Sequence, residues 1–170
     1  MKRIICLITG ILVCIIISAC NTTDQHIQVP VTYYYQTAAI DCKNPNGIIT
    51  SETQESAGYE EDYIYLTKQY LKGPTSSECI SPFPDSTQLE RLTILDDSVI
   101  VVLNTQFSEL TGHKLTIACS CLSKTLSEMT GLDTVTISAK DTLLDGMPSI
   151  TMTKNDFILT DDNQYIPDET

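Results

Sequence analysis

The stretch that decides the fold is residues 115–138, LTIACSCLSKTLSEMTGLDTVTIS. Its large apolar residues recur at helical spacing along one face: Leu115, Leu122, Leu126 and Met129. Gly131 then supplies a helix end, and residues 135–138 (VTIS) alternate apolar and polar as a half-buried strand does. We therefore expect a helix over residues 114–130 and a core strand directly after it.

A β-hairpin is predicted before this helix. Leu89–Leu95 and Val99–Leu103 are strand-like apolar runs joined by Asp96-Asp97-Ser98. Every residue of the second run is apolar, so both of its faces are expected to be buried or nearly so. The two aspartates fit a turn, where they form local hydrogen bonds, better than a general acid and base pair.

The first half of the chain predicts one more strand and one more helix. Residues 31–35 (VTYYY) are β-branched and aromatic, which favours a strand, and residues 48–50 fit a second short strand or an extended loop. A helix is expected over residues 59–72, because one face carries Tyr59, Tyr63, Leu66 and Tyr70, and Gly73-Pro74 ends it.

The order of these elements predicts the fold class. Strand, helix, two strands, helix and strand form an α+β protein. We expect a single compact β-α-β-β-α-β domain, with a mixed or antiparallel sheet and two helices. Residues 149–153 are expected to add an edge strand.

The N-terminal residues have the pattern of a secretory signal. Two basic residues precede an apolar run from Ile4 to Ile17, and small residues then lead to Cys20. Residues 17–20 (ISAC) resemble a bacterial lipobox, in which cleavage before the cysteine leaves a lipid on its thiol. A transmembrane helix is the alternative, but it needs about 20 apolar residues, and this run is shorter.

The signal sets the expected layout of the chain. We predict a lipoprotein signal peptide over residues 1–19, a lipidated tether over 20–30, the α+β domain over 31–153 and an acidic tail over 154–170. The lipid on Cys20 would anchor the protein to the extracytoplasmic face of the cell membrane.

The charge of the chain excludes some partners. It holds 10 basic and 22 acidic residues, a net charge of −12. Residues 1–19 contain only the two basic residues Lys2 and Arg3, so cleavage would shift the net charge to −14. An acidic protein is repelled by phosphate backbones, so we expect no nucleic-acid partner. The simplest interpretation of this negative charge is a solvated acidic surface. The more specific alternative is that the protein binds a basic partner or cations.

Four of the seven cysteines remain after the signal and Cys20 are set aside: Cys42, Cys79, Cys119 and Cys121. Outside the cytoplasm an even number permits disulfides, with three pairings. Free thiols and a metal site stay open as alternatives, although the sequence has no Cys-x-x-Cys pair. Cys119 and Cys121 are about 200° apart around a helix, so they should not bond each other.

No catalytic set is recognisable, and we expect no enzyme, no cofactor and no metal. His26 falls in the tether, and His113 opens the second helix, where an exposed capping role is expected. A nucleophile made from Cys119 or Cys121 with His113 is disfavoured, because an apolar environment makes a thiol inert. The three tyrosines at 33–35 fit a half-buried strand better than a platform for sugar rings.

The sequence resembles the GerMN domain, named for a spore germination and sporulation protein. The resemblance runs over residues 31–140, and its segments are Val31–Tyr35, Tyr70–Pro74, Phe83–Thr87, Val99–Asn104, Phe107 and Leu122–Val135. In that family a helix ends at a Leu-x-x-Gly-Pro signal, and a Pro-x-x-Thr loop leads into a hairpin. This chain has Asn104 where the pattern usually has Asp.

The resemblance implies a non-catalytic module on envelope lipoproteins of Gram-positive bacteria, in sporulation or germination. We therefore expect a membrane-anchored lipoprotein that mediates protein assembly in the cell envelope. Its partners would be the membrane, through Cys20, and an envelope protein, and homo-oligomers are allowed. The alternative is a lipoprotein that binds peptidoglycan or another glycan through exposed tyrosines.

Overall fold

The computed structural model describes residues 28–38, 48–57, 62–153 and 156. Several sequence predictions lie outside the described residues: the signal peptide, Cys20, His26, Cys42 and nearly all of the acidic tail. The first strand begins at Gln28, three residues before the predicted start of the domain.

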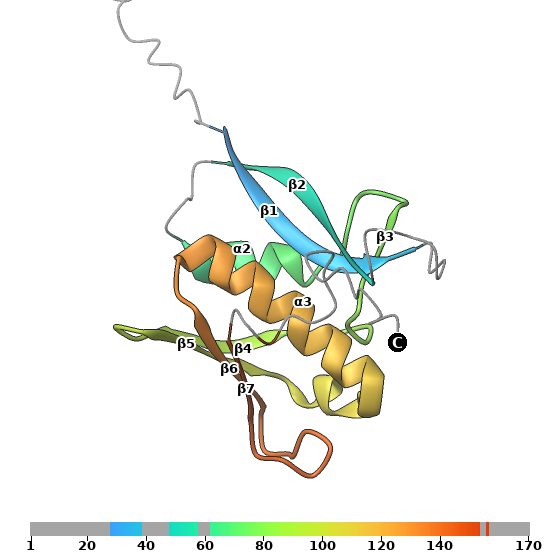
Figure 1. Ribbon diagram of the computed structural model, residues 1–170, viewed down its shortest axis with the longest axis vertical. Helices are drawn as coiled ribbons and strands as arrows, with labels where there is room; N and C mark the ends of the chain where they lie inside the picture. Colours follow the sequence, from blue (N-terminus) through green and yellow to red (C-terminus); the bar gives the residue numbers. More distant parts are fainter. Residues whose placement is uncertain (1–27, 39–47, 58–61, 154–155, 157–170) are drawn as a thin grey trace, which may run out of the picture.

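The described chain forms two short sheets, two α-helices and one 3-10 helix (Figure 1). The elements in order are β1 Gln28–Thr37, β2 Ile49–Ala57, α2 Tyr63–Tyr70, β3 Cys79–Ile80, β4 Leu89–Ile94, β5 Ser98–Leu103, η1 Thr105–Glu109, α3 Gly112–Thr130, β6 Thr134–Ala139 and β7 Ile150–Thr153. The predicted α+β class is confirmed.

The strands differ from the expectation of one sheet. β2, β1 and β3 form an antiparallel sheet, and β4, β5, β6 and β7 form a second, mixed sheet. Helix α3 lies between the sheets and contacts β1 on one side and β6 and β7 on the other (Figure 1). Each sheet therefore buries one face against the same helix.

β2 is longer than the short strand expected at residues 48–50. It pairs with β1 from Ile49 to Ala57, although residues 50–56 are all polar. Backbone hydrogen bonds hold an edge strand whatever its side chains are, so an exposed strand needs no apolar alternation.

The β5–α3–β6 unit forms the centre of the second sheet. β5 and β6 are parallel, with Val99 opposite Val135 and Leu103 opposite Ala139. In β5 every second residue is buried, whereas Ile100 and Val102 are only half-buried. Both faces were expected to be buried or nearly so; one face is fully buried, and the other is half-buried because the helix covers only one of them.

Helix α3 runs over nearly the expected range. Gly131 follows it in the left-handed conformation, with φ +72°, as a C-terminal glycine cap requires. Leu115, Leu122 and Leu126 are buried as predicted, but Ser120 and Thr125 are buried too. The helix is enclosed on more than one side because two sheets pack against it.

Helix α2 is shorter than predicted. It begins after Asp62, whose carboxylate accepts a hydrogen bond of 2.9 Å from the Tyr65 amide. This is an N-terminal cap, and such caps stabilise a helix by about 1 kcal/mol. Leu66 and Tyr70 are buried, as the predicted stripe requires.

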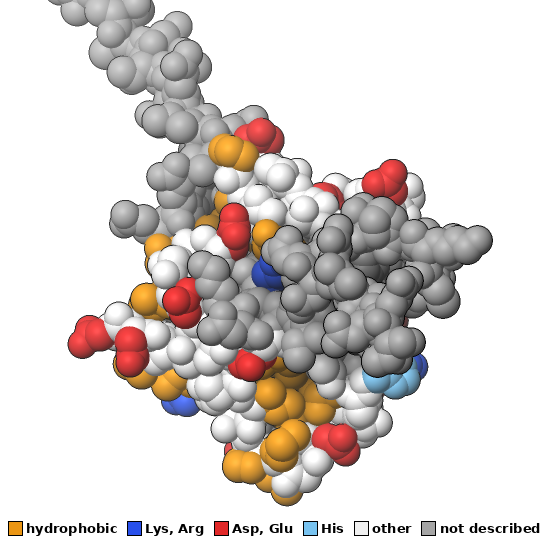
Figure 2. All heavy atoms as spheres, in the orientation of Figure 1, with side chains coloured by type: hydrophobic (Ala, Val, Ile, Leu, Met, Phe, Trp, Pro, Cys, Tyr) orange, Lys and Arg blue, Asp and Glu red, His pale blue; other side chains and the backbone are white. Residues whose placement is uncertain are grey.

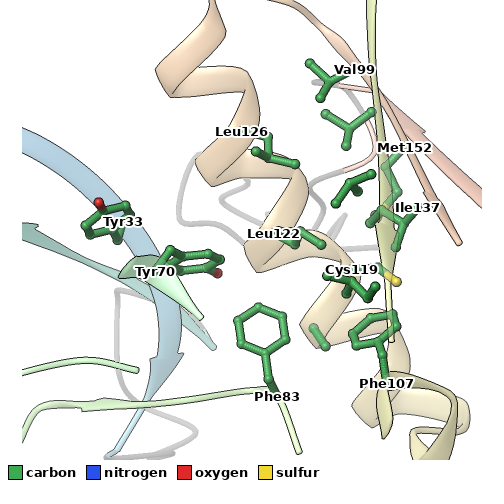
Figure 3. Packing of buried hydrophobic residues seen from close by; sticks show 14 of the residues in the cluster. Tyr33, Tyr70, Phe83, Val99, Phe107, Cys119, Leu122, Leu126, Ile137 and Met152 are labelled. Carbon is green, nitrogen blue, oxygen red and sulfur yellow. The ribbon is translucent and has the colours of Figure 1, made fainter. Parts of the chain in front are cut away.

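Aromatic rings connect the two layers of the core (Figure 3). Tyr33 of β1 stacks on Tyr70 of α2, with ring centroids 5.4 Å apart and planes 19° apart. Phe83 meets Tyr70 edge-on at 5.3 Å, and Phe107 lies 6.3 Å beyond Phe83. Such pairs add about 0.5–1.5 kcal/mol each beyond the area that they bury.

Helix side chains complete the backbone hydrogen bonds of β1. The backbone N–H of Tyr34 donates to the Thr125 hydroxyl of α3 at 2.9 Å, and its carbonyl accepts from the Tyr70 hydroxyl at 2.5 Å. β3 pairs with β1 only at Gln36 and Thr37, so within the described residues no strand reaches Tyr34 on that side. The Thr125 and Tyr70 hydroxyls therefore make the hydrogen bonds to Tyr34 that a neighbouring strand would otherwise make.

Candidate functional site

The predicted site residues do not converge on one place. His113 is exposed in the first turn of α3. It does not cap the helix, since the free amide of Gly112 donates instead to the Asp145 carboxylate at 3.2 Å. Asp96 and Asp97 lie in the exposed turn of the β4–β5 hairpin, where the Ser98 hydroxyl donates to the Asp97 carboxylate.

The described cysteines are buried free thiols. Cys119 packs in the main core, and Cys121 packs in a second apolar cluster with Ile49 and Ile117. Desolvation raises the pKa of the Cys119 thiol to about 12 and also raises the pKa of Cys121. A thiol with a raised pKa is a poor nucleophile and a poor metal ligand at neutral pH. Within the described residues no group of three or more His, Cys, Asp or Glu could hold a metal ion.

The three consecutive tyrosines do not form an exposed platform. Tyr33 and Tyr35 are buried, and desolvation raises the pKa of Tyr33 to about 12. Only Tyr34 is partly exposed, and its ring lies against α3, with the Lys124 ammonium 4.7 Å from the ring centroid. Sugar rings stack on open aromatic faces, which Tyr33 and Tyr35 lack.

Among the described residues, the face of the second sheet that points away from α3 carries polar side chains on both sides of the half-buried Ile100 and Val102 of β5. The side chains that point away from α3 are half-buried or exposed, and many are hydroxyls: Thr93, Thr134, Thr136, Ser138, Thr151 and Thr153. Thr136 and Thr151 are opposite each other on neighbouring strands, with hydroxyl oxygens 3.0 Å apart. We call this surface the threonine face. Figure 2 shows acidic side chains scattered over another part of the surface, with few basic ones between them.

A pocket of about 580 Å³ opens between the end of α2 and the loop over residues 81–88. Lys68 and Lys72 line it from the helix side, while Phe83, Ser86 and Leu89 line it from the loop and from β4. Both lysines are exposed, and neither is ion-paired with a carboxylate of the described chain. The pocket thus combines two free positive charges with hydroxyls and an apolar wall.

The loop that forms this pocket is fixed from outside by Asn104. The Asn104 amide donates to the Ser86 carbonyl at 2.9 Å and accepts from the Gln88 backbone N–H at 3.1 Å. Ser86 has φ +69°, a left-handed conformation that costs a non-glycine residue about 1 kcal/mol or more. Within the loop the Thr87 hydroxyl donates to the Pro84 carbonyl at 2.8 Å.

The sequence did not indicate this pocket. Two lysines four residues apart near the end of a helix are common, since the helix dipole favours them there. The four-residue spacing places Lys68 and Lys72 on one side of the helix end. Which loop faces them depends on tertiary packing, which the sequence does not reveal.

In the described part of the chain, no helix has the length and apolar character that a membrane span needs. The chain matches no protein-family model and no curated protein.

Solved structures do resemble it. The first GerMN domain of the sporulation protein GerM from Bacillus subtilis matches with a TM-score of 0.55 at 17% identity, over 75% of this chain and 99% of that one. The tandem GerMN domains of the same protein match with a TM-score of 0.57 at 16% identity, over 79% of this chain but only 48% of theirs. A candidate lipoprotein from Clostridium perfringens matches with a TM-score of 0.48 at 18% identity, over 76% of this chain and 89% of that one.

The chain thus spans about half of the tandem structure, which corresponds to one of its two domains. Because these sequence identities are below one fifth, the matches support a shared fold and nothing more specific. The resemblance that the sequence motifs predicted is confirmed at this level: the chain has a GerMN-like fold.

Proposed function

We propose that this protein is a lipid-anchored extracytoplasmic module that mediates protein assembly in the cell envelope during sporulation or germination, without catalysis. The observation that carries the proposal is the fold, which over 75% of this chain resembles a GerMN domain of a sporulation protein. The lipid would be attached at Cys20, the last residue of the lipobox-like sequence.

The described surface supports contacts with protein better than contacts with glycan. A glycan site would need open aromatic rings, and Tyr33 and Tyr35 are buried in the core. The threonine face carries many hydroxyls around the half-buried Ile100 and Val102, and within the described residues its sheet ends in the edge strands β4 and β7. Mixed polar and apolar surfaces and strand edges are typical of surfaces that bind other proteins.

The chemistry of the described residues favours a non-catalytic role. The buried thiols have raised pKa values, and His113 contacts neither of them. An acid, a base and a nucleophile must converge within hydrogen-bond reach for most hydrolytic reactions. His113 is exposed in the first turn of α3, Cys119 and Cys121 are buried further along the same helix, and Asp96 and Asp97 lie in the β4–β5 turn, so these groups do not converge.

Site-specific photo-crosslinking in the native cell tests the assembly role. A photo-reactive amino acid at Thr151, on the threonine face, should capture one defined envelope protein. The same group at Thr116, an exposed position on α3, is the matched control. Equal capture from both positions, or capture from neither, would contradict assembly through this face.

The anchor is tested separately. Cys20→Ala should release the protein from membranes or leave an unprocessed precursor, because the thiol that carries the lipid is gone. Mass spectrometry of the mature N-terminus is the direct measurement. A mature end elsewhere, without lipid, would refute the anchor.

A further inference from the structure

The pocket at the end of α2 has a charge that contrasts with the rest of the protein. The chain as a whole has a net charge of −12, yet two of its ten basic residues, Lys68 and Lys72, line this one hollow. Asp85 is the acidic residue among those that line it, so the pocket keeps an excess of positive charge. The helix end accounts for a basic residue there, but not for a hollow of 580 Å³ beside it.

We propose that this pocket binds an acidic, extended segment of the protein partner. Carboxylates of the segment would pair with Lys68 and Lys72, and an apolar side chain beside them would pack on Phe83 and Leu89. This inference rests on the proposed assembly function, because it supplies the chemistry of the partner.

The spacing of the lysines fits an extended peptide. Lys68 lies in the last turn of α2, and Lys72 lies in the turn directly after it, where Leu71 keeps the helical conformation and the Lys72 N–H donates to the Gln69 carbonyl at 3.0 Å. The two residues therefore keep about the 5–6 Å Cβ separation of residues four apart on a helix. In an extended chain the side chains of residues i and i+2 lie on one side, about 6.6 Å apart from a rise of about 3.3 Å per residue. Two carboxylates at alternate positions of a peptide therefore reach both lysines at once.

The pocket is also held in shape before any ligand arrives. Asn104 bonds both Ser86 and Gln88, and Thr87 closes the loop on the Pro84 carbonyl. A fixed loop loses little conformational freedom on binding, so more of the contact energy appears as affinity. Strained backbone such as that of Ser86 is found preferentially at ligand-binding sites.

Fluorescence anisotropy on the full chain, purified in a non-ionic detergent, tests the proposal. The probe is a labelled octapeptide with two glutamates at alternate positions and a leucine two residues further on. It should bind saturably with a dissociation constant below about 1 mM, and the same peptide with glutamine in place of glutamate should bind at least about fivefold more weakly. Binding should weaken as NaCl rises from about 50 to about 500 mM, because salt screens exposed charges.

Paired variants locate the binding. The double variant K68Q/K72Q should weaken binding at least about fivefold, as expected for two exposed ion pairs, while K68R/K72R should retain it. The matched control is K114Q/K140Q, which removes the same charge from other exposed lysines and should bind normally. Unchanged thermal unfolding of all three variants shows that any loss comes from the pocket.

Two outcomes would overturn the proposal. One is equal binding of the peptide by K68Q/K72Q and K114Q/K140Q, which would show that binding depends on the net charge of the protein and not on the pocket. The other is tighter binding of an oligogalacturonate, lost in K68Q/K72Q, which would make the pocket a site for acidic sugars. Crosslinking from Thr151 is an independent readout: if it succeeds while the peptide fails to bind, the assembly role stands and the pocket proposal does not.

Discussion

The Thr125 hydroxyl is the buried polar group of α3 that bonds the backbone of β1. Thr125 is fully buried, and it accepts the Tyr34 backbone N–H at 2.9 Å. The Tyr70 hydroxyl donates to the carbonyl of the same residue, Tyr34, at 2.5 Å. Burial raises the pKa of Tyr70 well above its usual value. Tyr70 is therefore a neutral donor at any physiological pH.

Replacing Thr125 with valine keeps the shape of the side chain and removes the hydroxyl. The Tyr34 N–H then has no acceptor, and leaving a buried donor unpaired costs about 1–3 kcal/mol. We expect the free energy of unfolding to fall by about 2 kcal/mol. With a urea dependence of about 2 kcal/mol per molar, the midpoint of urea unfolding should fall by about 1 M.

Two further variants separate the hydrogen bond from other effects. Thr116→Val makes the same substitution at an exposed position of the same helix, and it should change stability by less than about 0.5 kcal/mol. Thr125→Ser keeps the hydroxyl and loses one methyl group, so it should cost less than Thr125→Val. Tyr70→Phe should be non-additive with Thr125→Val, because both side chains bond the backbone of the same residue of β1, Tyr34.

The reasoning fails if Thr125→Val is no less stable than Thr116→Val in urea, with both variants unfolding in one transition. Equal costs for the valine and serine variants would also refute it, since packing rather than the hydroxyl would then account for the loss.

Three other predictions follow from the described contacts. Leu122→Asp should unfold the domain by circular dichroism, because core truncations alone cost about 2–5 kcal/mol and a buried charge adds to this; Thr116→Asp is the control, and a folded Leu122→Asp protein with unchanged melting would show that this face is not core. Glu52→Gln should lower stability at pH 7. Partial burial raises the pKa of the Glu52 carboxyl, but hydrogen bonds from Thr75 and Ser76 outweigh it and hold the pKa below its usual value. This stability is present above the unfolded pKa and lost as pH falls, so the difference from wild type should shrink below about pH 4.5; Glu55→Gln, at an exposed site of the same strand, is the matched control for the loss of one charge. Finally, Cys119 and Cys121 should resist alkylation until the protein unfolds, by peptide mapping with mass spectrometry, and rapid labelling of either in the native protein would contradict their burial.

The elements with strong local patterns were predictable from sequence. The helix over residues 112–130 has a clear apolar stripe and a glycine end, and the hairpin before it combines two apolar runs with an aspartate turn. These signals are contained within windows of a few residues, so they survive without knowledge of the tertiary structure.

The features that failed depend on tertiary contacts. β2 has no apolar alternation, and its partner β1 alone makes it a strand. Ser120 and Thr125 of α3 are polar and yet buried, because two sheets pack against the helix. Because the sequence predicted a single sheet, we expected only one face of α3 to be buried, whereas the two observed sheets bury two of its faces.

The position that departs from the GerMN-like pattern is the one that shapes the pocket. An aspartate at 104 could accept from the Gln88 amide, but it could not donate to the Ser86 carbonyl when ionised. Asn104 does both, at 3.1 and 2.9 Å, and the residue that it holds is the one with a left-handed backbone. With asparagine the loop is tied at two points, and no carboxylate at this position adds negative charge to the loop that faces Lys68 and Lys72. Asn104 directly follows β5, so this one side chain joins the end of the hairpin to the pocket loop and favours a pocket that is both rigid and positive. A difference that weakens the family resemblance in sequence therefore has a direct physical role in this chain.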